Sequence, residues 1–159
     1  MIYLSGRIKR LTKVNGGFLG EMLIRNPDRP LFMKFALWDN LLKNIPQLSI
    51  NQNIDIRGLF DSQNRINVTS LNKAEGLLYK NDIHSIVIVK SKDPKTDTVF
   101  VEENTKYGAK FAMDTDDQTA YDLLDKLYVV GNVSYIDKDG AREFHIKPKK
   151  VYKIDKEIL

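Results

Sequence analysis

The segment Arg29–Asn40, RPLFMKFALWDN, carries aromatic and basic residues at every second position of a predicted β-strand. A first alternating set is wholly apolar and consists of Leu31, Met33, Phe35 and Leu37. Because side chains alternate across a strand, burial of that set turns Phe32, Lys34 and Trp38 outward, with Ala36 between the last two. Aromatic rings stack on unpaired bases and amines neutralise phosphates. The segment therefore predicts a surface for single-stranded nucleic acid.

The same alternation turns more basic and aromatic residues outward on the neighbouring predicted strands. Inward Ile2, Leu4 and Ile8 leave Tyr3, Arg7 and Lys9 outside, and inward Ile54, Ile56, Ile66 and Val68 leave Arg57, Arg65, Asn67 and Thr69 outside. We predict that bases stack on Trp38 and Phe32, with Tyr3 and Phe60 as further candidates. The complete predicted binding set is Tyr3, Arg7, Lys9, Phe32, Lys34, Trp38, Arg57, Phe60 and Arg65.

A protein–protein interaction or oligomerisation module is the alternative interpretation of this face. Exposed aromatic residues are also the commonest anchors of protein interfaces. Lysine, however, is depleted in the cores of such interfaces and expected beside stacking rings in single-strand grooves. The interleaving of Lys34 with Phe32 and Trp38 therefore favours strand binding. RNA is a third option, since the sequence shows no reader of the 2′-hydroxyl.

No catalytic motif is found, so we expect a non-enzymatic protein without a cofactor or metal. His84 and His145 each lie in a strand-like run with no partner at a motif spacing. Asp114, Asp116 and Asp117 lack the glycine and distal glutamate of a calcium loop, and they stand where a helix cap is expected. The NGG at residues 15–17 matches no phosphate-binding loop.

The charge of the chain is concentrated in its first half. The net charge is +4 over 159 residues, but residues 1–80 hold twelve Lys and Arg against six Asp and Glu. A polyanionic partner of the first half is the simplest explanation. The chain has no cysteine, and no run approaches the ~20 apolar residues of a membrane helix. The opening MIYLSGRIKR lacks the layout of a signal peptide, so we expect a cytoplasmic protein without membrane contact.

Short alternating segments bounded by Gly, Asn, Asp and Pro predict an all-β protein with short helices. In the first half the predicted strands are 2–14, 18–26, 30–40, 53–60 and 65–71, with a short helix in 40–48. Three strands, a helix and two strands is the order of the OB-fold, a five-stranded barrel.

The second half repeats this order, which predicts two tandem OB-fold domains. Its predicted strands are 83–90, 98–104, 109–114, 128–136 and 142–152, with a helix over 116–127 whose apolar residues follow helical spacing. Matches between the halves include the KFA of residues 34–36 with that of 110–112, Gly58 with Gly131, and Ile66 and Val68 with Phe144 and Ile146. We expect a basic nucleic-acid-binding domain over 1–78 and an acidic accessory or partner-binding domain over 83–155, joined by 72–82. A single elongated β-domain is the alternative.

The first half resembles the bacterial and phage single-stranded DNA-binding proteins (SSB). The resemblance covers residues 1–75 and is carried by IYLSGRI with its Gly6–Arg7–Ile8, by FMKFALWDNLLKNI and by NIDIRGLF. It implies that Trp38 occupies a position that stacks on DNA in that family, and that Arg7 and Lys34 lie on or near its basic groove. It also implies non-enzymatic, largely sequence-independent binding of single-stranded DNA in replication, repair or recombination.

The second half departs from that family. SSB proteins usually continue into a flexible linker and an acidic tip that recruits other proteins, whereas this chain continues into a second predicted barrel and ends in KIDKEIL. In that barrel, Lys110, Ala112 and Asp114 have no aromatic residue beside them. We expect it to extend the site weakly through Lys147, Lys149, Lys150 and Tyr152, to form a homo-oligomer contact, or to bind a replication or recombination protein.

Overall fold

The computed structural model describes residues 1–25, 29–42, 47–74 and 81–154. The chain divides into two compact units, Met1–Asn81 and Asp82–Leu159. The regular secondary structure of the described residues is almost entirely β-strand, as the alternating sequence predicts. No described helix has the length and apolar character needed to cross a membrane.

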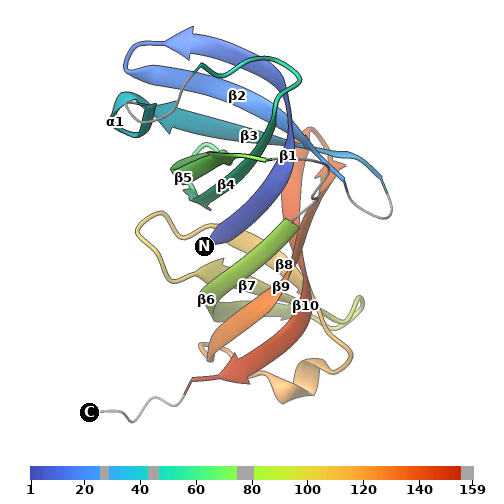
Figure 1. Ribbon diagram of the computed structural model, residues 1–159. Coiled ribbons are helices and arrows are strands. Elements are labelled where there is room, and N and C mark those ends of the chain that lie inside the picture. Colours follow the sequence, from blue (N-terminus) through green and yellow to red (C-terminus); the bar gives the residue numbers. More distant parts are fainter. Residues whose placement is uncertain (26–28, 43–46, 75–80, 155–159) are drawn as a thin grey trace, which may run out of the picture. The chain divides into compact units, whose positions relative to one another are not determined.

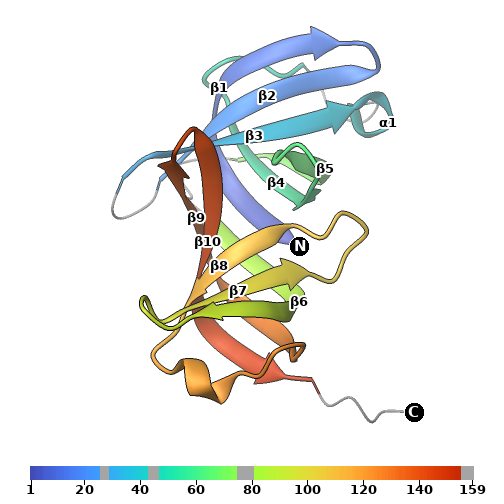
Figure 2. The ribbon, with the colours of Figure 1, turned by 180° about the vertical axis from the view of Figure 1, so that it is seen from behind.

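The first unit is a closed five-stranded barrel. Its strands are β1 (Ile2–Val14), β2 (Gly17–Ile24), β3 (Leu31–Trp38), β4 (Asn53–Phe60) and β5 (Ile66–Lys73). They are hydrogen bonded in the order β2-β3-β5-β4-β1, and β1 pairs again with β2 to close the ring (Figures 1 and 2). β1 serves both neighbours because its first half pairs with β4 and its second half with β2. This is the strand order of an OB-fold barrel.

Alternation along β3 places the core as predicted. Leu31, Met33, Phe35 and Leu37 are buried. Phe32 and Lys34 are exposed and Trp38 is half-buried, so the register expected from the sequence is confirmed. Ala36 is the exception because it is fully buried on the outward side. It is paired with Leu19 of β2 on one side and with Asn67 of β5 on the other, and both of these residues have longer side chains.

A short helix, α1 (Asp39–Leu42), follows β3, where the sequence predicts one over 40–48. Asp39 stands in its first turn, where a carboxylate complements the positive end of the helix dipole. Residues 43–46 of the predicted helix, residues 75–80 of the predicted connector and residues 155–159 lie outside the described ranges.

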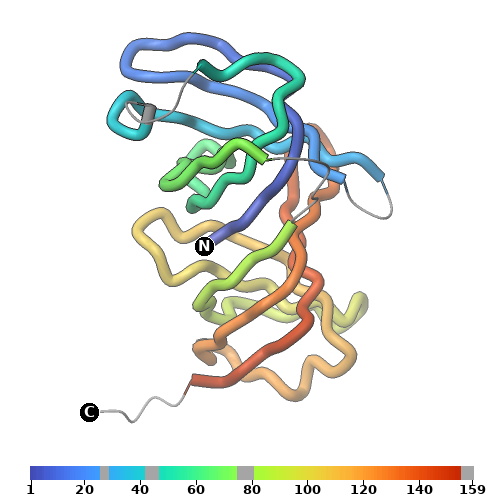
Figure 3. Tube along the Cα trace, viewed as in Figure 1, coloured from blue at the N-terminus to red at the C-terminus, as the bar shows by residue number. Residues whose placement is uncertain are grey.

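The second unit has the same cyclic pairing. Its strands are β6 (Asn81–Asp93), β7 (Thr98–Glu103), β8 (Lys110–Asp114), β9 (Lys126–Lys138) and β10 (Ala141–Lys153). They are hydrogen bonded in the order β6-β7-β8-β10-β9, and β6 also pairs with β9. The long β9–β10 hairpin can be followed in Figure 3. Its inward residues, among them Leu127, Val129 and Ile146, are fully buried.

The helix predicted over 116–127 is wrong. Only one 3-10 turn, η1 (Gln118–Ala120), forms there, capped by Asp117, which accepts a hydrogen bond from the Thr119 amide at 2.9 Å. The Thr119 hydroxyl and amide hold the pKa of Asp117 below its ordinary value. Beyond the turn, the amide of Leu124 donates to the Val89 carbonyl at 2.8 Å, and the Val89 amide donates to Asp125 at 3.0 Å. The Leu124 amide and the Asp125 carbonyl, which a helix would use, are therefore bonded to β6 instead.

The structure confirms one of the matches between the two halves and shifts the others. Gly58 and Gly131 each stand where the register slips against the next strand. A Cβ on Gly58 would lie 2.3 Å from the Asn67 carbonyl oxygen, and one on Gly131 would lie 2.4 Å from that of Lys147. At both positions only glycine allows this close approach.

The two halves can be aligned on their KFA segments or on Gly58 and Gly131, and these two alignments differ by two residues. Two residues after Gly58, Phe60 pairs with Ile66. Two residues after Gly131, Val133 pairs with Ile146. Ile66 thus corresponds to Ile146 rather than to Phe144. Since Ile66 pairs with Phe35 and Ile146 pairs with Met113, the counterpart of Phe35 is Met113 rather than Phe111.

Candidate nucleic-acid interface

Trp38 lies at the end of β3, between two hairpins. On one side it pairs with Gly17, and the following amide, Asp39, donates to the Gly16 carbonyl at 2.9 Å in the β1–β2 turn. Gly16 has a positive φ of 88°, which this tight turn requires. On the other side lies the β4–β5 loop, which begins at Asp61. In OB-folds, the β2–β3 face together with these two loops binds oligonucleotides.

The indole of Trp38 is held along its polar edge. Its Nε1–H donates to Asn67 Oδ1 on β5 at 2.8 Å. The guanidinium of Arg65 lies over the ring, 5.9 Å from the ring centroid. The side chain is half-buried, so the ring is fixed in orientation while part of its surface stays in contact with solvent. A fixed, partly exposed ring meets the requirement for stacking on an unpaired base.

Arg65 is partly neutralised by a residue that the sequence reasoning missed. Its Nε lies 2.6 Å from Asp61 Oδ2, and both side chains are largely buried. Asp61 Oδ1 also accepts from the Gln63 amide at 2.8 Å, which fixes the loop. The DSQNR loop motif carries this signal, because an aspartate at the start of a turn commonly accepts from amides further on. Arg65 therefore positions Trp38 in addition to offering charge.

Lys34 and Phe32 share the outward face of β2 and β3 with Trp38. Lys34 is exposed and stands opposite Glu21, and Phe32 is 39% exposed and stands opposite Leu23. No described carboxylate lies within 4.0 Å of the Lys34 amine. Arg10 of β1, opposite Glu21, extends this positive surface and is also exposed. The sequence reasoning did not select it because the parity of β1 changes at a bulge after Ile8.

The other predicted cations lie on a different part of the barrel. Arg57 on β4 faces Tyr3 on β1, with its guanidinium 5.6 Å from the Tyr3 ring centroid. Arg7 donates to Asn53 at 3.4 Å. In the ring of strands, β5 separates β4 from β3. The predicted set thus divides into a β2–β3 face with Trp38, Lys34, Phe32 and Arg65, and a β1–β4 face.

Lys9 and Phe60 complete the predicted set. Lys9 is the extra residue of the β1 bulge, and its amine donates to Asn51 Oδ1 at 3.3 Å. Phe60 is wrong as a stacking residue because it is 2% exposed. It shares the inward parity of Ile54 and Ile56 along β4, so its ring belongs to the core. We define the stacking face as Trp38, Phe32, Lys34 and Arg65.

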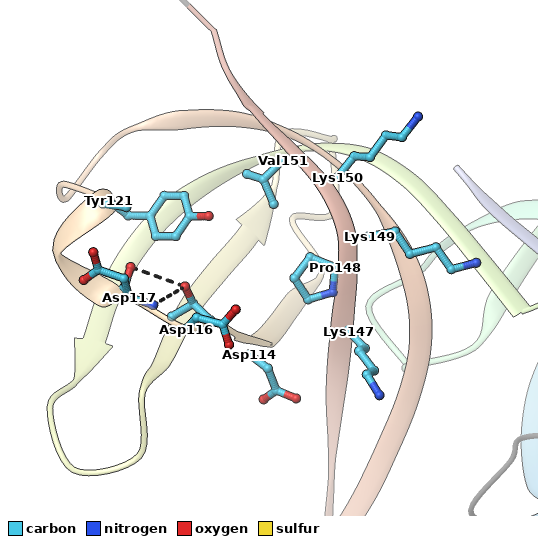
Figure 4. A pocket seen from close by; sticks show the side chains of 11 residues that line it. Asp114, Asp116, Asp117, Tyr121, Lys147, Pro148, Lys149, Lys150 and Val151 are labelled. Atoms are coloured by element: carbon cyan, nitrogen blue, oxygen red, sulfur yellow. Dashed lines mark hydrogen bonds between the residues drawn. The ribbon is translucent and has the colours of Figure 1, made fainter.

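In the second unit, a pocket of about 510 Å³ lies between the end of β8, η1 and β10 (Figure 4). Its lining combines Asp114, Asp116 and Asp117 with Tyr121 and with Lys147, Lys149 and Lys150. In Figure 4 the amines of Lys149 and Lys150 extend from β10 away from these carboxylates. Within the described ranges, no group of acidic or histidine side chains could hold a metal ion.

The closed barrel and its face define an OB-fold chain with a candidate oligonucleotide surface, and comparison with solved structures agrees with this fold. Wild-type single-stranded DNA-binding protein from Thermus aquaticus is similar over 97% of this chain and 92% of its own, with 11% sequence identity and a TM-score of 0.62. A deletion mutant of that protein carrying R190A is similar over 99% and 95%, with 11% identity and a TM-score of 0.65. No family model matches the chain, and no curated protein matches it significantly in sequence.

Proposed function

We propose that the protein binds single-stranded DNA without enzymatic activity and largely without sequence preference. The observation that carries this proposal is the stacking face, where the Trp38 ring is fixed by Asn67 and lies between two OB-fold loops. Lys34 beside it has no carboxylate partner among the described residues. The similarity in fold to a protein whose name states that it binds single-stranded DNA supports the proposal.

The proposal assigns separate roles to the two halves. Residues 1–78 form the basic OB-fold domain that holds the strand, and residues 83–155 form a second OB-fold domain with an accessory role. The cyclic strand pairing of each unit supports two tandem OB-folds. Arg7, Lys9 and Arg57 guide the strand electrostatically from the β1–β4 face, and Tyr3 offers a further ring for stacking there. DNA replication, repair or recombination is the setting in which such an activity is used.

The single tryptophan provides a direct test. Titration with oligo-dT at low salt is expected to quench Trp38 fluorescence. Added salt is expected to restore it because salt cations compete with the basic side chains of the protein for the phosphates. Trp38→Ala is expected to weaken binding of a labelled oligonucleotide ~10-fold, and Trp38→Phe less, because one stack contributes ~1–3 kcal/mol. A titration without any fluorescence change and without binding would exclude the proposal and favour a protein-interaction module. Competition between matched DNA and RNA oligonucleotides decides which strand is preferred.

A further inference from the structure

The outward face of β6, β9 and β10 carries a row of large apolar and aromatic side chains. Tyr128 of β9 pairs in register with Ile86 of β6 on one side and with Tyr152 of β10 on the other. All three point outward, because the intervening Val87, Leu127 and Val129 are buried in the core. We call these three residues the tyrosine row.

The rings of the tyrosine row are close and accessible. The centroids of Tyr128 and Tyr152 are 6.3 Å apart, and their planes are inclined by 30°. Tyr152 is 54% exposed and Ile86 is 40% exposed. Three neighbouring large side chains that share an exposed sheet face mark an interaction surface more than isolated ones do.

Lysines flank the row on both sides. On β9, Lys126 lies two residues before Tyr128 and Val130 lies two residues after it. Lys150 of β10 pairs with Val130. No ion-pair partner of either lysine occurs among the described residues, whereas Lys153 lies 3.4 Å from Asp125. Figure 4 shows the Lys150 amine directed away from the acidic side of the pocket. The row is therefore bordered by cations that are available to phosphates.

This surface does not repeat the stacking face of the first unit. With Gly58 matched to Gly131, the tyrosine row corresponds to Ser5, Asp55 and Asn72 of the first unit, a row without an aromatic residue. The stacking face lies instead on β2 and β3, whose counterparts are β7 and β8. The second unit thus has an aromatic surface of its own on different strands.

We propose that the tyrosine row, with Lys150 and Lys126, is a second stacking surface for single-stranded DNA, an inference that rests on the proposed function. Its charge complements a polyanion, and paired rings bordered by lysines are the elements of a single-strand site. A contact between protein chains is less suited to the row, because lysine is depleted in the cores of such interfaces.

Photocrosslinking tests the position of the strand directly. An oligo-dT of about 30 nucleotides, long enough for two OB-folds, carries 5-iododeoxyuridine and is irradiated with the full-length protein. Peptide mass spectrometry is expected to find adducts on Trp38 and on Tyr128 or Tyr152. Adducts on Trp38 alone would overturn the second surface and leave the proposed function intact. Loss of all binding in the titration would instead overturn the proposed function.

Substitutions test whether the row contributes to affinity. The double variant Tyr128→Ala/Tyr152→Ala is expected to bind the same oligonucleotide about fivefold or more weakly. Tyr152→Phe is expected to stay within about twofold, because phenylalanine still stacks. Tyr107→Ala is the matched control, since Tyr107 is similarly exposed beside Lys106 elsewhere in the second unit. Quenching of Trp38 by an oligo-dT of about 8 nucleotides, short enough for one barrel, is expected to remain unchanged.

Two further outcomes overturn the inference. One is unchanged affinity in a folded double variant. The other is a change of oligomeric state with unchanged affinity, measured by sedimentation, which would assign the row to a contact between copies of the chain. Should the double variant fail to fold, the affinity of Tyr152→Ala for the same oligonucleotide decides between these outcomes. This ring is the more exposed of the two, so its removal disturbs the fold less.

Discussion

The orientation of the Trp38 indole decides which of its surfaces a base can stack on, and Asn67 on the neighbouring strand provides the hydrogen bond that fixes it. Asn67 accepts the Nε1–H at 2.8 Å from β5, which runs parallel to β3 at this point. A ring fixed before binding loses less conformational entropy when a base stacks on it. Asn67 is thus a positioning residue for the stacking face.

Asn67→Ala is expected to weaken oligo-dT binding severalfold and to lower the free energy of unfolding by about 1 kcal/mol, the net worth of one hydrogen bond. The released indole is expected to show lower steady-state fluorescence anisotropy in the unbound protein. Thr69→Ala, at the next outward position of β5, serves as the control. Affinity and anisotropy equal to those of the native protein would show that Asn67 does not position the ring.

Asp61 limits how much positive charge Arg65 offers to a strand. Asp61→Asn keeps the oxygen that accepts the loop amide of Gln63 and removes the charge that pairs with Arg65. We expect tighter oligo-dT binding and a salt dependence steeper by about 0.7, the slope for one more neutralised phosphate on a single strand. Asp97→Asn, an equal charge change in the turn before β7, is expected to leave the slope nearly unchanged. Equal slopes for the two variants would mean that only net charge matters.

At the level of single residues, the sequence shows which way a side chain points but not what it contacts. Period-two alternation placed Trp38, Lys34 and Phe32 outward correctly, and applied strictly it also places Phe60 inward. The Asn67 and Asp61 contacts depend on the parallel β3–β5 pairing and on the loop conformation. Neither follows from the pattern of one strand.

At the level of elements, the segment over 116–127 shows where periodicity fails. Ala120, Leu123, Leu124 and Leu127 have helical spacing, but only Leu127 is buried. Leu124 has a positive φ of 69° and donates its amide to β6. Pairing with an adjacent strand satisfies these backbone groups, so the spacing of the leucines does not decide the conformation.

Leu124→Asn discriminates between the two conformations of this segment. In the observed turn the side chain is 61% exposed and the backbone is left-handed, which asparagine tolerates better than leucine. The midpoint of thermal unfolding is therefore expected to stay the same or to rise slightly. In an amphipathic helix with Leu124 in the core, the same change would cost about 2 kcal/mol or more. A large fall in the midpoint of thermal unfolding would contradict the observed turn and support the helix predicted over 116–127.

At the level of the whole molecule, element order was predictable and the correspondence between the halves was less so. The ten strands of the described residues follow from short apolar runs separated by turn residues, and the cyclic pairing follows from the OB-fold order. Aligning the halves on KFA gave a correspondence that is wrong by two residues. Inward positions repeat at every second residue of a strand, so a short match of this kind fits equally well two residues away. The glycines at the register slips are the more reliable markers, since a carbonyl of the next strand excludes a side chain at each.

The uneven charge of the chain allows a final prediction about where a strand is held. Residues 1–80 have a net charge of +6 within a total of +4, so a local effect can be separated from a general one. The double variant Lys34→Gln/Arg10→Gln removes two exposed cations from the outward face of β1 and β3 that carries Trp38. Its plot of log affinity for oligo-dT against log salt is expected to be shallower by about 1 to 1.4, at ~0.7 for each lost phosphate contact. Lys95→Gln/Lys138→Gln removes the same charge from the exposed β6–β7 turn and the exposed end of β9 in the second unit and is expected to change the slope little. An equal decrease of the slope in both double variants would indicate that net charge alone holds the strand. The strand would then have no defined path across the stacking face.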